Sequence, residues 1–312
     1  MSDARNSREI CENNNDVERP PEVDFERPRR EDIGTNRVDW STIERELPVD
    51  ILLVTVKDDE FVCCYYHIKD TAKRCWCPGL GMVDFGTFGG GGVKVGLIRC
   101  AKGAVEPRGS LISVKNAVEA LRPKAVVCVG YCGSINREKA KLGDVVISAK
   151  LATYSDKKVT TDGSEEIRGI KVNVSKNMGL LIPFAADGWQ PPLKESSNFE
   201  VGVHREYVML SGPEVVNYSE RRQQLLRHFP DAIGIEMEGQ GLYTAAYDLG
   251  IEWVVVKGVS DFADGTKTET TSWQPFASAM AASIVYNMFK YPDVIQQWPH
   301  YTKPVQAATS TA

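Results

Sequence analysis

The chain has 312 residues, of which 42% are hydrophobic and 25% are charged, and its formal net charge is −5. This is the composition of a globular protein, so a wholly disordered or fibrous chain is excluded. A dedicated nucleic-acid binder normally carries a basic footprint, and the acidic balance argues against one. A local basic pocket for a phosphorylated small molecule is still compatible with this charge.

The two ends of the chain differ from its middle. Residues 1–46 are rich in charged residues, Asn and Pro, with almost no aliphatic side chains before Ile43. Such a segment buries too little apolar surface to offset its ordering entropy, so it predicts a disordered tail, of which Trp40 and Ile43 can dock on the fold. Residues 293–312 predict a second, loose tail. The folded domain is expected to span residues 47–292.

Neither a leader nor a membrane span is expected from the sequence. Residues 1–5 are polar, and no apolar stretch follows them, so no secretory signal is expected. The longest apolar stretch, Ala125–Cys132, is far shorter than the roughly 18 residues that a spanning helix needs. We therefore expect a cytoplasmic protein without a membrane partner.

The cysteines favour free thiols over a disulfide framework or a metal site. The chain has 8 cysteines, and none follows Cys132, whereas disulfides typically staple small secreted chains throughout. The spacings of Cys63-Cys64 and Cys75-x-Cys77 are not those of a zinc knuckle. No metal and no other cofactor is expected.

Strand and helix patterns alternate along the folded domain. Residues 50–56 are a continuous apolar run, as expected for a strand covered on both faces. Ser110 is a helix start followed by apolar residues at helical spacing. Residues 155–200 are a polar, turn-rich excursion with one helix. We predict strands at 50–56, 82–88, 93–100, 125–129, 142–147, 207–210, 232–236 and 253–259, and helices at 61–68, 110–121, 178–186, 219–228, 239–249 and 273–289.

This alternation predicts an α/β fold, a three-layer αβα sandwich with a mixed, largely parallel central sheet. Ligands of such folds bind at the carboxyl ends of the strands. Polar residues follow four predicted strands, at Lys57–Glu60, Gly130–Gly133, Ile235–Gly239 and Lys257–Asp264. We therefore expect an acidic crevice at one edge of the sheet.

Carboxylates in such a crevice repel one another and are partly desolvated, which raises a carboxyl pKa and suits the group to act as an acid. Ordinary alternatives stay open for each residue. Glu60 can be a solvated residue of a first helical turn, and Glu236 a charge at a helix start. Asp261 and Asp264 can cap the turn that follows them.

Three motifs carry a family resemblance. Gly143–Val146, Ile235–Gly239 and Val259–Asp264 resemble the marks of the nucleoside phosphorylase/nucleosidase superfamily, and the resemblance extends over Pro48–Phe289. That superfamily includes purine nucleoside phosphorylase, uridine phosphorylase and methylthioadenosine/S-adenosylhomocysteine nucleosidase. With Trp273–Ala277, the third motif is more similar still to nucleosidase domains of immune receptors in fungi and invertebrates and to ATP-cleaving effectors of antiviral defence.

The resemblance implies three catalytic residues. Asp261 is the general acid that protonates or hydrogen-bonds N7 of a purine, so it has to hold a proton near neutral pH. Glu238 binds the ribose hydroxyls and steadies an oxocarbenium-like transition state. Glu60 positions the attacking water.

The same resemblance implies further substrate contacts. Met237 packs against the sugar, Val215 and Val216 stack on the base, and Ser260 supports the acid. Lys257 stands where related nucleosidases have an arginine beside the water.

The resemblance also bears on whether phosphate or water attacks. Bacterial phosphorylases bind phosphate with an arginine and a serine, and those positions read Cys128 and Tyr131 here. Without its guanidinium an oxyanion site loses its best bidentate donor, which favours hydrolysis. Tyr131 also departs from the serine of methylthioadenosine nucleosidases, which argues against that particular substrate.

A nucleotide substrate would need basic partners. The loop from Lys102-Gly103 to Arg108-Gly109 precedes a helix start, where anions are readily bound, so Gly103 and Arg108 are candidate contacts together with Lys267. Plain surface charges are the ordinary alternative. The basic candidates near the strand ends are Lys57, Lys102, Arg108, His204, Arg205 and Lys267.

The expected function is therefore hydrolysis of the N-glycosidic bond of ATP or a related adenine nucleotide, giving adenine and a ribose 5′-phosphate, in an innate-immune depletion effector. One alternative is a methylthioadenosine/S-adenosylhomocysteine nucleosidase or a purine or uridine nucleoside phosphorylase of metabolism. Another is a non-catalytic nucleotide-binding scaffold. The expected partners are a small purine nucleotide or nucleoside and further copies of the chain in a homo-oligomer.

Overall fold

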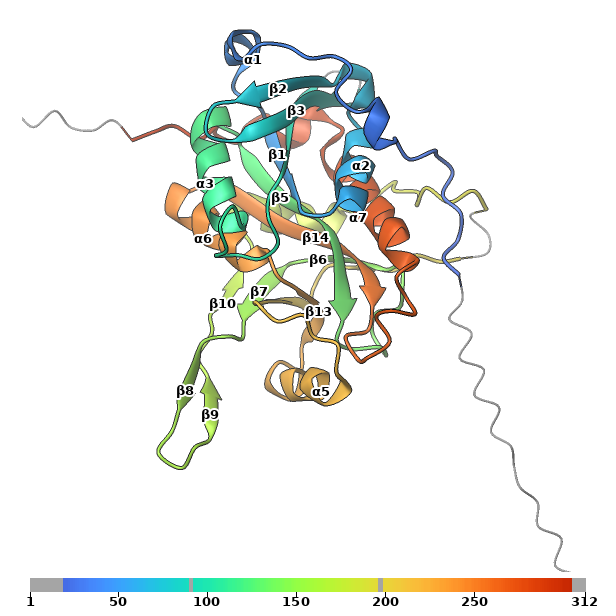
Figure 1. Ribbon diagram of the computed structural model, residues 1–312, viewed down its shortest axis with the longest axis vertical. Coiled ribbons are helices and arrows are strands. Elements are labelled where there is room, and N and C mark those ends of the chain that lie inside the picture. Colours follow the sequence, from blue (N-terminus) through green and yellow to red (C-terminus); the bar gives the residue numbers. More distant parts are fainter. Residues whose placement is uncertain (1–18, 90–91, 196–198, 305–312) are drawn as a thin grey trace, which may run out of the picture.

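The computed structural model describes residues 19–89, 92–195 and 199–304 (Figure 1). Over these residues, one 12-stranded sheet has the order β10-β7-β12-β13-β5-β1-β4-β3-β2, with β14, β6 and β11 joined to it beside β5. The strands are β1 (Ile51–Thr55), β2 (Lys73–Cys77), β3 (Gly81–Phe88), β4 (Val93–Arg99), β5 (Ala125–Ser134), β6 (Val145–Ile147), β7 (Lys150–Thr153), β10 (Lys171–Asn173), β11 (Val203–His204), β12 (Val208–Ser211), β13 (Ala232–Glu236) and β14 (Glu252–Asp261).

The centre of the sheet is parallel and its flanks are mixed. Strand β1 pairs in parallel with β4 and β5, and β5 pairs in parallel with β14. Every residue of β1 is buried, as its apolar run predicts for a strand covered on both faces. Antiparallel pairs such as β3 with β4 and β13 with β5 complete the sheet.

Helices cover both faces of this sheet. On one face α2 (Asp58–Tyr66) packs beside α7 (Trp273–Phe289), and on the other α3 (Ser110–Leu121) packs beside α6 (Gly239–Leu249) (Figure 1). Two large apolar clusters separate these helix pairs from the strands. The three-layer αβα prediction with a mixed sheet is confirmed.

The predicted helices at 110–121, 239–249 and 273–289 match the observed ones to the residue, as does α5 (Ser219–His228). The predicted helix at 61–68 begins earlier, at Asp58, so Glu60 lies in its first turn. The predicted strand at 125–129 continues to Ser134 and carries the Gly-Tyr-Cys-Gly segment into the sheet.

The excursion at 155–200 holds more structure than expected. The hairpin of β8 (Lys157–Val159) and β9 (Glu165–Ile167) projects from the body of the molecule (Figure 1). The helix predicted at 178–186 is α4 (Lys176–Leu181), followed by a 3₁₀ turn at Ile182–Phe184. Short polar strands such as β8 and β9 lack the apolar alternation by which strands are predicted.

The prediction of a disordered tail is wrong for residues 19–46, but the expected docking of Trp40 and Ile43 on the fold is confirmed, since both pack in one apolar cluster. A helix, α1 (Trp40–Glu46), ends this segment, and Ile33 and Ile43 are buried. The Phe25 ring stacks on Tyr66 of α2 at 4.1 Å between centroids. A few well-spaced apolar side chains are enough to dock the segment on the domain. The first 18 residues of the predicted tail lie outside the described residues.

The prediction of a loose tail from residue 293 is wrong as far as Tyr301. A 3₁₀ turn at Pro292–Ile295 buries Ile295, and Tyr301 is also buried. The Tyr301 amide donates to the Pro123 carbonyl at 2.9 Å. The chain therefore returns to the end of α3 before the described residues stop.

The seven cysteines of the described ranges are free thiols, as predicted, and Cys11 lies outside these ranges. No helix within residues 19–89, 92–195 and 199–304 combines the length and apolar character needed to cross a membrane. The same ranges contain no cluster of three or more His, Cys, Asp or Glu side chains suited to a metal ion.

His67, at the end of α2, makes the fold sensitive to acid. Its ring stacks on Tyr286 of α7 at 4.9 Å, and its Nε2 is buried without a partner among the described residues. Burial lowers the pKa of His67 to about 4. The unfolded chain takes up a proton below about pH 6.5, whereas the folded protein does so only near pH 4, so stability is lost as the pH falls through this window.

We expect His67→Phe to remove this loss. Between pH 8 and pH 5 the free energy of unfolding of the wild type should fall about 2 kcal/mol more than that of the variant. Urea unfolding at the two pH values measures the difference. An equal change in both proteins would show that His67 titrates normally in the fold.

Candidate active site

A cavity of about 270 Å³ opens at the carboxyl ends of β1, β5, β13 and β14. The predicted crevice is therefore present, and it is acidic. Eight of the predicted site residues line it together: Glu60, Tyr131, Val215, Val216, Met237, Glu238, Asp261 and Lys267.

Glu60 lies in the first turn of α2 and is buried, so it is not a solvated surface residue. Its Oε2 accepts the amide N–H groups of Val56 at 2.7 Å and Lys57 at 2.9 Å, and its Oε1 accepts the amide of Tyr131 at 3.2 Å. Burial raises the pKa of Glu60, and Lys257 opposes that rise. The carboxylate is held rigidly with its oxygens at the cavity.

Glu238 immediately precedes α6 and is also buried. Its Oε1 accepts the Gly103 amide at 3.0 Å, and Ser110 Oγ donates to its backbone carbonyl at 2.6 Å. These contacts tie the carboxylate to the loop before α3. The predicted anion-binding amide of Gly103 is thus already engaged by Glu238.

Lys257 is a fully enclosed cation behind the cavity. Its side chain on β14 is 1% exposed, and its Nζ lies 3.5 Å from Glu238 Oε2 and 3.9 Å from Glu236 Oε2. Burial by itself would lower the pKa of Lys257, but Cys128 and the carboxylates of Glu60, Glu238 and Glu236 raise it well above its ordinary range. The lysine therefore holds these acids together as one charge cluster rather than contacting a ligand in the cavity.

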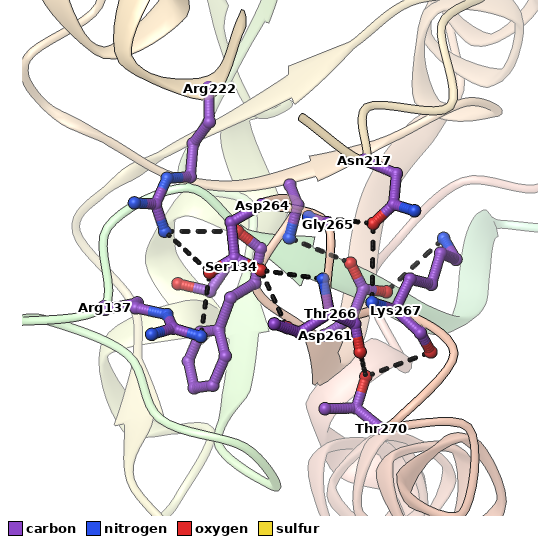
Figure 2. Close-up of polar contacts among 12 residues, drawn as sticks. Ser134, Arg137, Asn217, Arg222, Asp261, Asp264, Gly265, Thr266, Lys267 and Thr270 are labelled. Carbon is purple, nitrogen blue, oxygen red and sulfur yellow. Dashed lines mark hydrogen bonds and ion pairs between the residues drawn. The ribbon is translucent and has the colours of Figure 1, made fainter. Parts of the chain in front are cut away.

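Asp261 ends β14 and is buried at the cavity wall. Its Oδ1 accepts the Ala263 amide at 3.1 Å, and its Oδ2 accepts the Ser260 hydroxyl at 3.1 Å. Lys267 Nζ lies 3.4 Å from the same Oδ2 (Figure 2). Ser260 thus holds the Asp261 carboxylate by a hydrogen bond from its hydroxyl.

Two glycines of β5 make room for the carboxylates. A Cβ at Gly130 would lie 2.1 Å from Glu60 Oε1, and a Cβ at Gly133 would lie 2.9 Å from Asp261 Oδ1. Both separations are shorter than a van der Waals contact. The Gly-Tyr-Cys-Gly segment therefore lets both acids approach the same strand.

The turn that follows Asp261 is anchored by Asp264. Its carboxylate pairs with Arg137 at 2.8 Å and with Arg222 of α5 at 3.4 Å, and it accepts the Thr266 amide at 3.2 Å (Figure 2). Asp264 therefore caps the turn, which was the ordinary alternative for this residue. It does not line the cavity. Asn217 Oδ1 accepts the Gly265 amide at 3.1 Å and joins this turn to the opposite wall.

That opposite wall is the predicted base-stacking segment. Val216 is buried, whereas Val215 is 49% exposed and available to a ligand. Glu214 forms a bidentate pair with Arg221 of α5 at 2.7 and 2.6 Å. Arg221 thus pairs with Glu214 in this wall of the cavity. Its neighbour on α5, Arg222, pairs with Asp264 in the turn that forms the other wall.

Three of the six proposed basic residues, Arg108, His204 and Arg205, do not line the cavity, and Arg205 instead donates to the Pro183 carbonyl. Arg108 is exposed and lies outside the lining, so it does not form the expected anion cradle with Gly103. His204 instead pairs with Asp144 at 2.9 Å. Lys57 and Lys102 do line the cavity.

Glu236 was expected in the acidic crevice, with a helix-start charge as the ordinary alternative, but it was given no catalytic or binding role. It does accept the amides of Glu238 and Gly239, each at 2.9 Å, but it also lines the cavity beside Lys257. Burial raises the pKa of Glu236. The Glu-x-Glu spacing at the end of a predicted strand is the signal that could have marked Glu236 as a site residue.

Residues 85–288 match the sequence profile of the phosphorylase superfamily, and the chain belongs to that superfamily. It is 31% identical over 218 residues to a death domain-containing ATP nucleosidase of Amphimedon queenslandica, an alignment that covers 64% of this chain and 40% of that protein. It is 25% identical to a 5′-methylthioadenosine/S-adenosylhomocysteine nucleosidase of Desulfotalea psychrophila, covering 70% of this chain and 88% of that protein.

Solved structures agree on the fold. The methylthioadenosine/S-adenosylhomocysteine nucleosidase of Neisseria meningitidis, in complex with methylthio-immucillin-A, superimposes with a TM-score of 0.63 at 19% identity, covering 77% of this chain and 98% of that one. The corresponding enzyme of Colwellia psychrerythraea, in complex with adenine, gives 0.63 at 18% identity, covering 77% and 94%.

Proposed function

We propose that this chain is a purine N-glycosidase, a hydrolase of N-glycosyl bonds. The observation that carries this proposal is that Asp261, Glu238 and Glu60 face one cavity, with Lys257 enclosed behind them. Breaking the bond between a purine and ribose creates negative charge on the base and positive charge on the sugar. An acid at one wall and carboxylates at the other match both developing charges.

The geometry suggests one role for each carboxyl group. Asp261 hands a proton to N7 of the base, which lies against Val215 and Val216. Glu238 accepts hydrogen bonds from the ribose hydroxyls and stabilises the cationic sugar. Glu60, fixed by three backbone amides, accepts a hydrogen bond from the attacking water and orients it towards the sugar carbon.

The substrate we propose is ATP or a related adenine nucleotide. The relative named as an ATP nucleosidase supports this choice, and so do two cations at the cavity, Lys57 and Lys102, whose side chains are exposed. A cavity of about 270 Å³ lies just below the usual range of ligand pockets, roughly 300–1,000 Å³. The base and ribose would fill it, with the phosphates extending towards these lysines.

The wider biological role is part of the same proposal. We infer a cytoplasmic, homo-oligomeric effector of innate immunity that depletes nucleotides, and the name of the Amphimedon queenslandica relative, a death domain-containing ATP nucleosidase, supports the effector role. This chain spans 40% of that relative's length.

A nucleoside substrate is the second candidate, because the cavity is lined by more carboxylates than lysines. A polyanion enters such a site less readily than a neutral nucleoside does. The bacterial relative named as a methylthioadenosine/S-adenosylhomocysteine nucleosidase is matched over 88% of its length.

The double variant Lys57→Gln, Lys102→Gln separates the two candidates. If the lysines bind phosphates, kcat/KM for ATP should fall about tenfold or more while kcat/KM for adenosine stays within about twofold. Lys158→Gln on the β8–β9 hairpin is the matched control, since Lys158 is exposed away from the cavity. An equal loss for both substrates, or a wild type that prefers methylthioadenosine, would favour the nucleoside.

A further inference from the structure

The contacts of Asp261 suit its charged form. A backbone amide donates to Oδ1, and a hydroxyl and the Lys267 ammonium both lie against Oδ2. Donors and a cation around a carboxylate stabilise its ionised state. A general acid has to give a proton to the base, however. Its proton must then come from a neighbour that can reach both Asp261 and solvent.

Lys267 occupies that place. It follows β14 on the turn anchored by Asp264, and its own backbone amide donates to Asn217 Oδ1 at 3.4 Å (Figure 2). Its side chain is 33% exposed, yet its Nζ lies 3.4 Å from Asp261 Oδ2. Lys267 also lines the cavity. One ammonium therefore touches the acid on one side and water on the other.

We propose that Lys267 supplies the proton that Asp261 passes to the departing purine, an inference that rests on the proposed function. As the bond from the sugar carbon to N9 breaks, its electron pair moves into the base and makes N7 basic. Lys267 Nζ gives a proton to Oδ2 of the Asp261 carboxylate and becomes a neutral amine, and the protonated Asp261 gives that proton to N7. Water adds to the sugar carbon, and the proton it loses returns through solvent to the neutral amine.

Ser260 can partner both states of the acid. Its hydroxyl lies 3.1 Å from Asp261 Oδ2 and 3.3 Å from the carbonyl oxygen of Cys132. It donates to the charged carboxylate, or it accepts from the protonated one while donating to the carbonyl. Proton passage through Asp261 therefore leaves no buried polar group without a partner.

The other ionisable groups around the cavity do not take over this role. Glu60, Glu236 and Glu238 share the enclosed Lys257, whose closest carboxylates are Glu238 and Glu236. Tyr131 and Cys132, the remaining groups that face Asp261 from β5, are neutral because burial raises the pKa of both. Lys267 acts through Asp261 and is in that sense a positioning residue.

The pH dependence of kcat for adenine release tests the proposal. In the wild type the Lys267 ammonium lies against Asp261 Oδ2 and is the nearby proton source. In Lys267→Met the proton has to come from bulk water, so kcat should fall about 100-fold at pH 8. At pH 5.5 the loss should shrink to less than about tenfold, because acids in the solvent are then abundant enough to replace the lysine as the proton source. Lys158→Met is the matched control.

Chemical rescue provides a second measurement. Added methylammonium should restore part of the pH 8 rate of a Lys267→Ala variant, because a small amine can occupy the vacated space beside Asp261. A pH-independent loss in Lys267→Met, together with no rescue in Lys267→Ala, would overturn the proposal. If the wild type releases no adenine at any pH, the proposed function fails instead.

Discussion

Replacing Asp261 by Asn should abolish release of the purine base while leaving the fold intact. An amide keeps the size of the side chain and one acceptor oxygen, but it cannot pass a proton to N7. A positioned general acid contributes about 10²–10⁴-fold, so kcat should fall by at least about 10²-fold. Chromatographic measurement of free adenine against time gives this ratio directly.

Asp156→Asn is the matched control, since Asp156 is exposed outside the cavity. An unchanged thermal unfolding midpoint for Asp261→Asn would show that the loss is chemical. If Asp261→Asn instead releases base at the wild-type rate, the acid lies elsewhere. If neither protein releases base, the scaffold alternative is favoured.

Replacing Lys257 by Met should have the largest effect on stability. The substitution removes the enclosed cation that holds Glu236 and Glu238. Losing one partner of a buried ion pair typically costs about 3–5 kcal/mol. Urea unfolding at pH 8 measures that loss, and adenine release should fall with it because Glu238 and Glu60 lose their common counter-charge.

The sign of the pH effect distinguishes this charge cluster from ordinary packing. Burial already raises the pKa values of Glu60 and Glu236, and without Lys257, which opposes that rise, these pKa values in the folded variant lie further above their unfolded values. Their stabilising contribution is then present at low pH and is lost as the pH rises, so the destabilisation relative to wild type should be smaller at pH 5 than at pH 8.

Lys73→Met, which breaks an exposed pair with Glu46 at 2.6 Å, should cost no more than about 1 kcal/mol at either pH. A loss for Lys257→Met that is equally small, or that grows towards acid pH, would contradict the cluster.

Much of the fold followed from apolar periodicity. Local sequence patterns predict these elements: apolar runs predict the buried strands β1 and β13, and an amphipathic pattern predicts α3. Together they indicate where the strand ends meet. The strand ends therefore predict Glu60, Glu238 and Asp261 in one acidic crevice. Glycines 130 and 133 are spaced to admit two of these acids, a feature visible only once their neighbours are known.

The remainder depended on tertiary contacts. Phe25 and Ile33 are isolated apolar residues in a polar segment, so no periodicity shows that they dock. The Gly103 amide looked free to bind an anion, but Glu238, 135 residues away in sequence, accepts from it. The contact of Lys267 with Asp261 arises from a turn whose path is set by Arg137 and Arg222.

The central claim is that this cavity cleaves the bond between adenine and ribose. The most direct measurement is chromatography of the products formed from ATP by the wild-type chain in phosphate-free buffer. The account predicts free adenine and ribose 5′-triphosphate in equal amounts, and none of either from Asp261→Asn. Recovery of intact ATP, together with no base released from adenosine or methylthioadenosine, would contradict it.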